Sequence, residues 1–336
     1  MGTDPQGLSP SQPGPCHDPA LSFPEPKPID IFVQQLINGV VLGSIYAMVA
    51  LGYTMVYGIL GLINFAHGEV VMIGAMVGIW AIMAIGTASG LPGPLVVLAG
   101  MAVAIPACML LGALLERVAY RPLRDAPRLT ALITAIGMSI VLQNLAMIVW
   151  GRQYISFPPL LPNDPLPVLG ATITGTQIMI VMLTVSLMSL LLVLIHRTRL
   201  GRAMRATAQS PALAGLMGVD VNRIIMFTFM IGSALAAVAG IMVAGYYGQA
   251  HYHMGFMLGL KAFTAAVLGG IGNVSGAMLG GLALGLIEAL GAGYIGALTG
   301  GLLGSHYQDV FAFAVLILVL VFRPSGLLGE RVAERA

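Results

Sequence analysis

The sequence predicts an all-α fold: a polytopic membrane helical bundle of eight to nine membrane segments, with nine favoured and one broken or re-entrant. Of the 336 residues, 58% are apolar and only 8% are charged, whereas a soluble domain carries about 25% charged residues because its surface faces water. The apolar residues gather in blocks almost free of charge, and several reach the ~20 residues that a helix needs to cross a bilayer. These blocks are 31–57, 70–85, 95–115, 129–150, 176–195, 224–245 and 310–322.

Glycine is the third observation behind this fold class. The chain has 44 glycines, and many are paired four residues apart, which lets helix backbones approach closely in lipid. We therefore expect a tightly packed bundle. The pairs are Gly39 with Gly43, Gly74 with Gly78, Gly276 with Gly280, Gly281 with Gly285, and Gly296 with Gly300.

Residues 1–30 form a separate, proline-rich segment that we predict to be disordered. Its prolines break any helix, and little of it could enter a core. It lacks a basic stretch followed by an apolar one, so it does not resemble a cleaved signal peptide. The membrane domain is expected to span 31–329, followed by a short cytoplasmic tail at 330–336.

The distribution of arginine predicts the topology. Segments 115–129 and 195–224 and the C-terminus are rich in arginine, whereas 151–175 contains Arg152 alone and 246–255 contains no Lys or Arg. Basic loops stay in the cytoplasm. The C-terminus is therefore expected inside and the N-terminal tail outside.

Residues 255–299 are harder to assign. They contain Lys261, Glu288 and a glycine-rich run at 269–276. Two membrane passes must fit here if the C-terminus is cytoplasmic, so the first would be a short pass over 256–268 that breaks at the glycine run. A discontinuous helix is tolerated at membrane depth where it is buried in protein or lines a cavity.

Ionisable residues near the apolar blocks are the candidates for a translocation path or gate. A charge inside a bilayer costs at least ~2.5–3.5 kcal/mol, so such residues usually face a cavity or one another. We interpret Asn64, His67 and Glu69 in this way, together with Lys261, and a contact between Lys261 and Glu69 is conceivable. For Glu288 we favour a solvated position at the outer interface.

The segments around Asn64 and Asn273 share a short pattern. In each, an Asn lies three or four residues before a glycine and enters an apolar helix of small residues. Transporters are often built from repeats whose broken segments meet near the midplane. Asn273 is therefore a further candidate, although a chain so rich in glycine also produces such matches by chance.

The cytoplasmic loop 196–223 combines arginines with small and apolar residues. Ser210 is a plausible N-cap with Pro211 at the first helical position. The residues that could form one face of a short helix here are Ala206, Leu213, Leu216 and Met217. Such a helix suits a groove on a partner protein or a position on the membrane surface, and both interpretations remain open.

Several functions are excluded by missing motifs. Neither Lys27 nor Lys261 lies in a phosphate-binding Walker A loop, so ATP, if it drives this protein, must bind another chain. The sequence contains no metalloprotease, hydrolase or paired-cysteine metal motif, so we expect no enzyme activity, metal or cofactor. The formal charge of +2 does not suggest a nucleic-acid partner. We expect Cys108 to pack as a small apolar side chain and not to form a disulfide.

Two long motifs and the C-terminal segment stand out from the rest of the chain. They are Gly52-Tyr53-Thr54-Met55-Val56-Tyr57-Gly58 running into Gly61-Leu62-Ile63-Asn64-Phe65-Ala66-His67-Gly68-Glu69, then Lys261-Ala262-Phe263-Thr264-Ala265-Ala266-Val267-Leu268-Gly269-Gly270-Ile271-Gly272, and Phe322-Arg323-Pro324-Ser325-Gly326-Leu327-Leu328-Gly329. Together they resemble the permease subunits of branched-chain amino acid ABC importers, of the LivH type. The resemblance covers roughly 31–329.

The resemblance implies an assembly in the bacterial inner membrane. It would contain a second, LivM-like permease, two cytoplasmic ATPase subunits and a periplasmic binding protein that delivers Leu, Ile or Val. Segment 199–220 would then be the coupling segment, although it lacks the Glu of the general Glu-Ala-Ala…Gly importer signature. The coupling candidates are Arg202, Arg205, Ala206, Ala208, Gly215 and Asp220.

Two other functions remain open at this stage. The first is a permease of the same family that carries urea or short amides, which shared motifs cannot distinguish. The second is a secondary transporter that uses His67, Glu69 and Glu288 as a proton relay.

Overall fold

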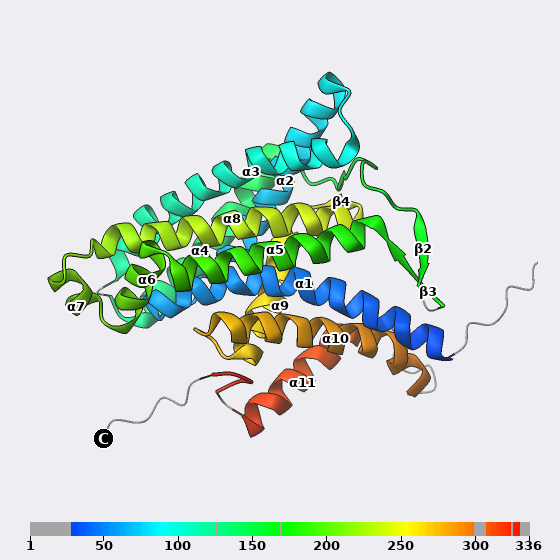
Figure 1. The fold of residues 1–336 in the computed structure, drawn as a ribbon. Coiled ribbons are helices and arrows are strands. Elements are labelled where there is room, and N and C mark those ends of the chain that lie inside the picture. The colour runs from blue at the N-terminus through cyan, green and yellow to red at the C-terminus, as the bar shows by residue number, and fades with distance from the viewer. Residues whose placement is uncertain (1–27, 125, 169, 299–306, 324, 330–336) are drawn as a thin grey trace, which may run out of the picture.

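The computed structural model describes residues 28–124, 126–168, 170–298, 307–323 and 325–329, and these are mostly helical (Figure 1). Helix α1 begins at Pro28, three residues before the predicted start of the membrane domain, and residues 1–27 and 330–336 lie outside the described part. The helices are α1 (Pro28–Leu60), α2 (His67–Ser89), α3 (Gly93–Leu115), η2 (Glu116–Tyr120), η3 (Arg121–Leu123), α4 (Arg128–Trp150), α5 (Gly175–Arg197), α6 (Arg199–Gln209), α7 (Pro211–Leu216), α8 (Val221–Tyr247), α9 (Met254–Gly269), α10 (Val274–Leu298) and α11 (Gln308–Phe322).

The described helices include seven that are long and apolar enough to cross a membrane, and two shorter apolar ones. The seven are α1, α2, α3 with its η2–η3 extension, α4, α5, α8 and α10. The shorter ones are α9 and the apolar part of α11, Ala312–Phe322. This confirms the polytopic all-α fold, and it agrees with the predicted eight to nine segments if both shorter helices enter the membrane.

Loops predicted on the same side of the membrane contact one another. At one end, β1 (Ile155–Ser156) pairs antiparallel with β4 (Gln249–Ala250), and β2 (Pro165–Val168) pairs with β3 (Ala171–Thr174). Figure 1 shows these strands at the end of the bundle opposite α6 and α7. The contacts are consistent with the grouping of loops by arginine content.

Where the central helices cross, glycines leave no side chain between the two backbones. A Cβ on Gly43 would lie 2.7 Å from the Cα of Leu282, and one on Gly285 would collide with the backbone of Gly43. Helices α1 and α10 therefore meet backbone to backbone, as expected where small residues drive packing in lipid. Gly74 similarly contacts Ala237 between α2 and α8.

The predicted break after the short pass is present. Helix α9 ends at Gly269, and the turn that follows uses positive φ at Gly270 (107°) and Gly272 (95°), a region that glycine enters without a Cβ penalty. The C-terminal segment covers this break, because Leu328 N donates to Gly269 O at 2.9 Å.

Candidate functional site

The predicted candidates Asn64, His67 and Glu69 lie where α1 gives way to α2, and all three are buried. The chain turns at Gly61 (φ 62°) and runs through a short loop to His67, the first residue of α2. Tyr120 Oη donates to Asn64 Oδ1 at 2.6 Å. The break between the helices thus brings three polar side chains into the bundle.

Glycines on three helices make room for this cluster. The His67 ring fits against Gly52, where any Cβ would collide with Nε2, and it packs edge-on against Tyr53 with centroids 4.8 Å apart. Gly68 lies against Gly255, again too closely for a Cβ. The first turn of α2 is therefore held between α1 and α9.

Glu69 is 0% exposed, and its one hydrogen bond to a described residue comes from Ser139 Oγ to its Oε1 at 3.1 Å. Among the described residues, neither Glu69 Oε2 nor His67 Nε2 has a hydrogen-bond partner. Buried polar atoms without partners are rare because each costs ~1–3 kcal/mol. Both atoms therefore retain unused hydrogen-bonding capacity.

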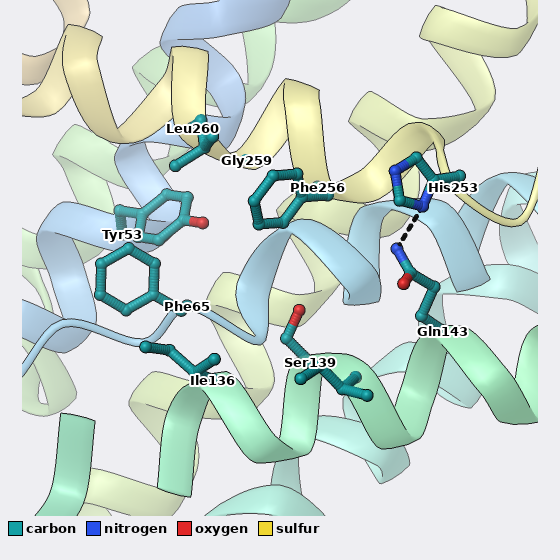
Figure 2. Close-up of a pocket in the computed structure, with 10 residues that line it drawn as sticks. Tyr53, Phe65, Ile136, Ser139, Gln143, His253, Phe256, Gly259 and Leu260 are labelled. Carbon is teal, nitrogen blue, oxygen red and sulfur yellow. Dashed lines mark hydrogen bonds between the residues drawn. The ribbon is translucent and has the colours of Figure 1, made fainter. Parts of the chain in front are cut away.

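A first cavity of about 200 Å³ opens beside this cluster, between α1, α4 and α9. Figure 2 shows Ser139 and Gln143 on α4 facing Phe256 on α9 and His253, the residue just before α9, with Tyr53 to one side. Gln143 Nε2 and His253 Nδ1 lie 2.8 Å apart. Because Ser139 both lines the cavity and binds Glu69, it connects the cavity to the buried carboxylate.

A second cavity, of about 260 Å³, lies against another face of α9. Its lining includes Tyr46, Tyr247, His251 and Lys261, and it reaches the strand β4. His253, Phe256 and Leu260 line the first cavity, whereas Met254, Met257, Leu258 and Lys261 line the second. The short helix α9 therefore separates the two cavities.

The conceivable contact between Lys261 and Glu69 is not formed. Lys261 Nζ instead lies 2.7 Å from both Glu288 Oε1 and Asp309 Oδ1, and Tyr46 Oη donates to Glu288 Oε2 at 2.9 Å. Glu288 is 2% exposed, so its predicted solvated position at the outer interface is wrong. The physical reason is the partner on α9, since a paired and hydrogen-bonded carboxylate can be buried.

Asn273 lies apart from the cavities and has a structural role. Its Oδ1 accepts from Gly276 N at 3.1 Å, so it caps the start of α10, and its Nδ2 donates to Leu328 O at 2.9 Å. The pattern shared with Asn64 reflects a helix start in both segments, since Asn64 O accepts from His67 N at 3.0 Å.

The loop 196–223 forms two short helices in place of the single one that its apolar face suggested. Ser210 caps α7 through its bond from Leu213 N at 3.3 Å, and Pro211 occupies the first turn, as predicted. This cap separates Ala206, which lies on α6, from the apolar residues of α7. The face is divided because the Ser-Pro sequence ends one helix and begins another.

The remaining coupling candidates differ in their surroundings. Arg202 and Ala208 are exposed on α6, and Arg205 donates to the carbonyl of Ile195, which ties α6 to the end of α5. Gly215 has nothing within 4 Å of a Cβ. Asp220 caps α8 by accepting from Arg223 N at 3.1 Å.

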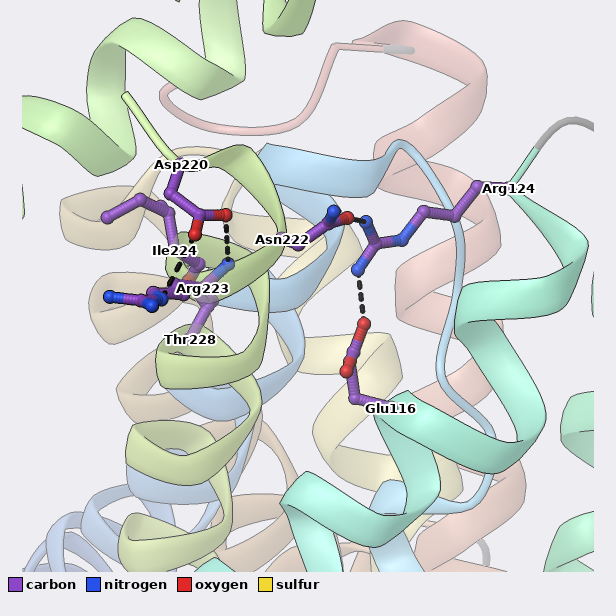
Figure 3. A network of polar contacts seen from close by, with 7 residues as sticks. All are labelled: Glu116, Arg124, Asp220, Asn222, Arg223, Ile224 and Thr228. Carbon is purple, nitrogen blue, oxygen red and sulfur yellow. Dashed lines mark hydrogen bonds and ion pairs between the residues drawn. The ribbon is translucent and has the colours of Figure 1, made fainter. Parts of the chain in front are cut away.

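A polar network that the sequence interpretation missed joins loop 115–129 to the start of α8. Arg124 donates to both Glu116 and Asn222, and Glu116 is buried (Figure 3).

The sequence interpretation also missed Tyr46 and Tyr53, each of which lines one of the two cavities. Their spacing of seven residues puts them on one face of α1, and this was the signal that could have found them.

A bundle of membrane helices with a buried, partly unpaired polar cluster beside a cavity is the architecture of a membrane transport protein. Residues 35–320 match the family described as "Branched-chain amino acid transport system / permease component", and the chain belongs to this family. It is 48% identical to the high-affinity branched-chain amino acid transport system permease protein BraD of Pseudomonas aeruginosa, over 90% of this chain and 98% of that protein.

Two further relatives extend the comparison. The chain is 48% identical to the permease protein LivH of Escherichia coli K12, over 90% of this chain and 97% of LivH. It is 25% identical to a probable branched-chain amino acid permease LivH of Methanocaldococcus jannaschii, over 89% of this chain and 94% of that protein.

Proposed function

We propose that this permease forms the path for Leu, Ile and Val in an ATP-binding-cassette importer of the bacterial inner membrane, with a cytoplasmic C-terminus. The relatives BraD and LivH, both named as high-affinity branched-chain amino acid permeases, support the substrate class. A second LivM-like permease completes the path, and a periplasmic binding protein delivers the amino acid. Two ATPase subunits bind and hydrolyse ATP, so this chain needs no cofactor.

The ATPase-driven part of this proposal rests on the exposed apolar residues of α7 and on the residue that follows it. Leu216 and Met217 are 83% and 85% exposed, and Leu213 is also exposed. Helix α7 contains no basic residue, whereas helices that lie on a membrane surface are rich in Lys and Arg. A groove on a partner protein therefore fits α7 better than lipid headgroups do.

The attachment of this segment explains how it transmits motion. Thr198 Oγ1 accepts from Gly201 N at 3.0 Å, and Arg205 donates to the carbonyl of Ile195 near the end of α5. At the other end, Asp220 caps α8. A displacement of α6–α7 by the ATPases is therefore passed to α5 and α8, which cross the membrane beside α1.

The first cavity is the proposed passage. Ser139, Gln143 and His253 provide hydrogen-bonding groups for the charged ends of an amino acid, while Ile136 and Phe256 provide apolar surface for its side chain. Selectivity rests largely on the binding protein, so a tight ligand site is not required here.

Substitution of Gly215 by Trp tests the coupling role. Because the position is open within this chain, the variant should fold and reach the membrane normally, yet uptake of labelled leucine should fall at least tenfold and the ATPase should no longer co-purify. Val168→Trp, at an exposed position in the opposite end of the molecule, is the matched control and should transport normally. Normal uptake by Gly215→Trp would refute the docking assignment.

Competition separates the substrate classes. An excess of unlabelled Leu, Ile or Val should abolish uptake of labelled leucine, and urea or acetamide should not. The alternative of a proton relay receives no support from the hydrogen bonds, because Glu288 bonds to Lys261 and Tyr46 and no described bond joins it to His67 or Glu69. Uptake that continues without the ATPases and stops with a protonophore would restore that alternative.

A further inference from the structure

A basic pocket of about 290 Å³ lies between the η2–η3 extension of α3 and the first turn of α8. Its lining includes Arg117, Arg121 and Arg223, together with the acidic residues Glu116 and Asp220. It lies at the end of the bundle that carries the coupling segment, because Asp220 ends that segment. Of its lining residues, only Asp220 has a part in the transport steps described above, as the cap of α8.

The acidic residues of the basic pocket are already neutralised. Glu116 pairs with Arg124, and Asp220 Oδ2 lies 3.0 Å from Arg223 Nε (Figure 3). The side chains of Arg117 and Arg121 are exposed and form no hydrogen bond or ion pair with another described residue. Counting Arg117, Arg121, Arg124 and Arg223 against Glu116 and Asp220 leaves a net charge of 4 − 2 = +2.

The basic pocket lies directly at the edge of an apolar, exposed surface. Leu110 and Leu114 on α3 and Val118 on η2 recur at four-residue spacing and are all exposed. They lead to Arg117 and Arg121. On α8, the exposed Phe227 follows Arg223 by one turn. The arginines of the pocket therefore lie at the end of a surface that is apolar enough to face hydrocarbon.

We propose that this pocket binds the phosphate of an anionic phospholipid in the adjoining leaflet. Arginine presents a planar fork of donors that fits phosphate oxygens bidentately, and basic pockets beside membrane helices bind anionic headgroups. The acyl chains lie along Leu114 and Leu110, which is why a lipid fits better than a soluble anion. The bound lipid adds a contact between η2–η3 and α8 beside the bond of Arg124 to Asn222.

The test uses the intact purified permease with whatever subunits accompany it. The protein is titrated with dioleoyl phosphatidylglycerol or dioleoyl phosphatidylcholine, and native mass spectrometry counts the lipids retained. Wild-type protein should retain phosphatidylglycerol preferentially. Replacing both arginines (Arg117→Gln with Arg121→Gln) should weaken phosphatidylglycerol binding roughly tenfold or more, because each arginine near a charged lipid contributes about a factor of five.

The matched control is Arg197→Gln with Arg199→Gln, which removes the same charge from exposed positions at the same end of the molecule. It should change binding less than twofold. Equal losses in both variants would show general charge attraction and would overturn the pocket. Complete displacement by excess inorganic phosphate would assign the site to a soluble anion and overturn the lipid.

A second variant keeps the proposal testable if the glutamine protein does not fold. Arg117→Lys with Arg121→Lys preserves the charge and should keep the preference for phosphatidylglycerol with weaker binding. If either double variant of Arg117 and Arg121 binds lipid normally but loses its ATPase subunits, the pocket is a protein contact and the lipid proposal fails.

Discussion

Lys261 Nζ lies 2.7 Å from Glu288 Oε1, so an ion pair inside the apolar bundle joins α9 to α10. Asp309 brings α11 to the same ammonium group, and Tyr46 brings α1 to the same carboxylate. Four helices therefore meet at one charge cluster, of which Tyr46 and Lys261 line the second cavity. Removing one member should leave another charge buried without its partner.

The variant Lys261→Met is expected to be strongly destabilised. It leaves Glu288 buried beside Asp309, and an uncompensated buried charge costs about 3–5 kcal/mol. The melting temperature of the purified protein in detergent should fall well below that of the wild type. Combining Lys261→Met with Glu288→Gln should recover part of the loss. Equal melting temperatures for wild type and the single variant would show that the pair contributes nothing.

Gly285→Ala should disrupt the contact between α1 and α10. The new Cβ would meet the backbone of Gly43, which cannot rotate away, and such overpacking typically costs about 1–3 kcal/mol. Gly137→Ala on α4 is the matched control, because nothing lies within 4 Å of its Cβ. The control should be neutral or more stable by about 0.5–1 kcal/mol. The measurement is the thermal unfolding curve of each purified variant. Equal melting temperatures for Gly285→Ala and Gly137→Ala would argue against close helix packing.

Ser139→Ala should remove the hydrogen bond to Glu69 and lower uptake. The buried carboxylate would lose its only described donor, at a cost of about 1–3 kcal/mol, and the passage would lose a polar group. Labelled-leucine uptake, normalised to protein in the membrane, should fall severalfold. Ser186→Ala is the control, because Ser186 is exposed on α5 and bonds to its own helix at Met182 O. Full activity of Ser139→Ala would remove this serine from the proposed passage.

Cysteine accessibility should establish the sidedness of the two ends. In a Cys16→Ser background, Leu216→Cys should react with an impermeant maleimide after the cells are opened, whereas Leu166→Cys should react in intact cells. Both leucines are exposed, and the native Cys108 is fully buried and should stay unlabelled. The reversed pattern would place α7 outside the cell and would also exclude ATPase docking there.

The helical spans could be predicted from the sequence because their signal is local. A run of apolar residues near 20 long identifies a membrane helix without knowledge of its neighbours. The cap at Ser210 and the break at Gly270 were predictable for the same reason, since each depends on residues a few positions apart. The grouping of loops by arginine agrees with the contacts between β1 and β4.

The pairing of charges could not be predicted, because it depends on which helices meet. The partners Tyr46 and Glu288 are separated by 242 positions, and nothing local distinguishes a carboxylate at an interface from one beside a lysine on another helix. Glu116 shows the same limit, because an arginine-rich loop indicates sidedness and does not reveal a buried acid within it. The roles of Asn64, His67 and Glu69 in transport stay predictions.

The crossing of α1 with α10 has a mechanical consequence. Where backbones touch at Gly43 and Gly285, no flexible side chain remains to absorb a sliding motion. We expect these two helices to act as a stiff strut that keeps its geometry throughout the transport cycle. Helix α4 is mostly exposed and lines the first cavity, so we expect it, and not α1 or α10, to change position during transport.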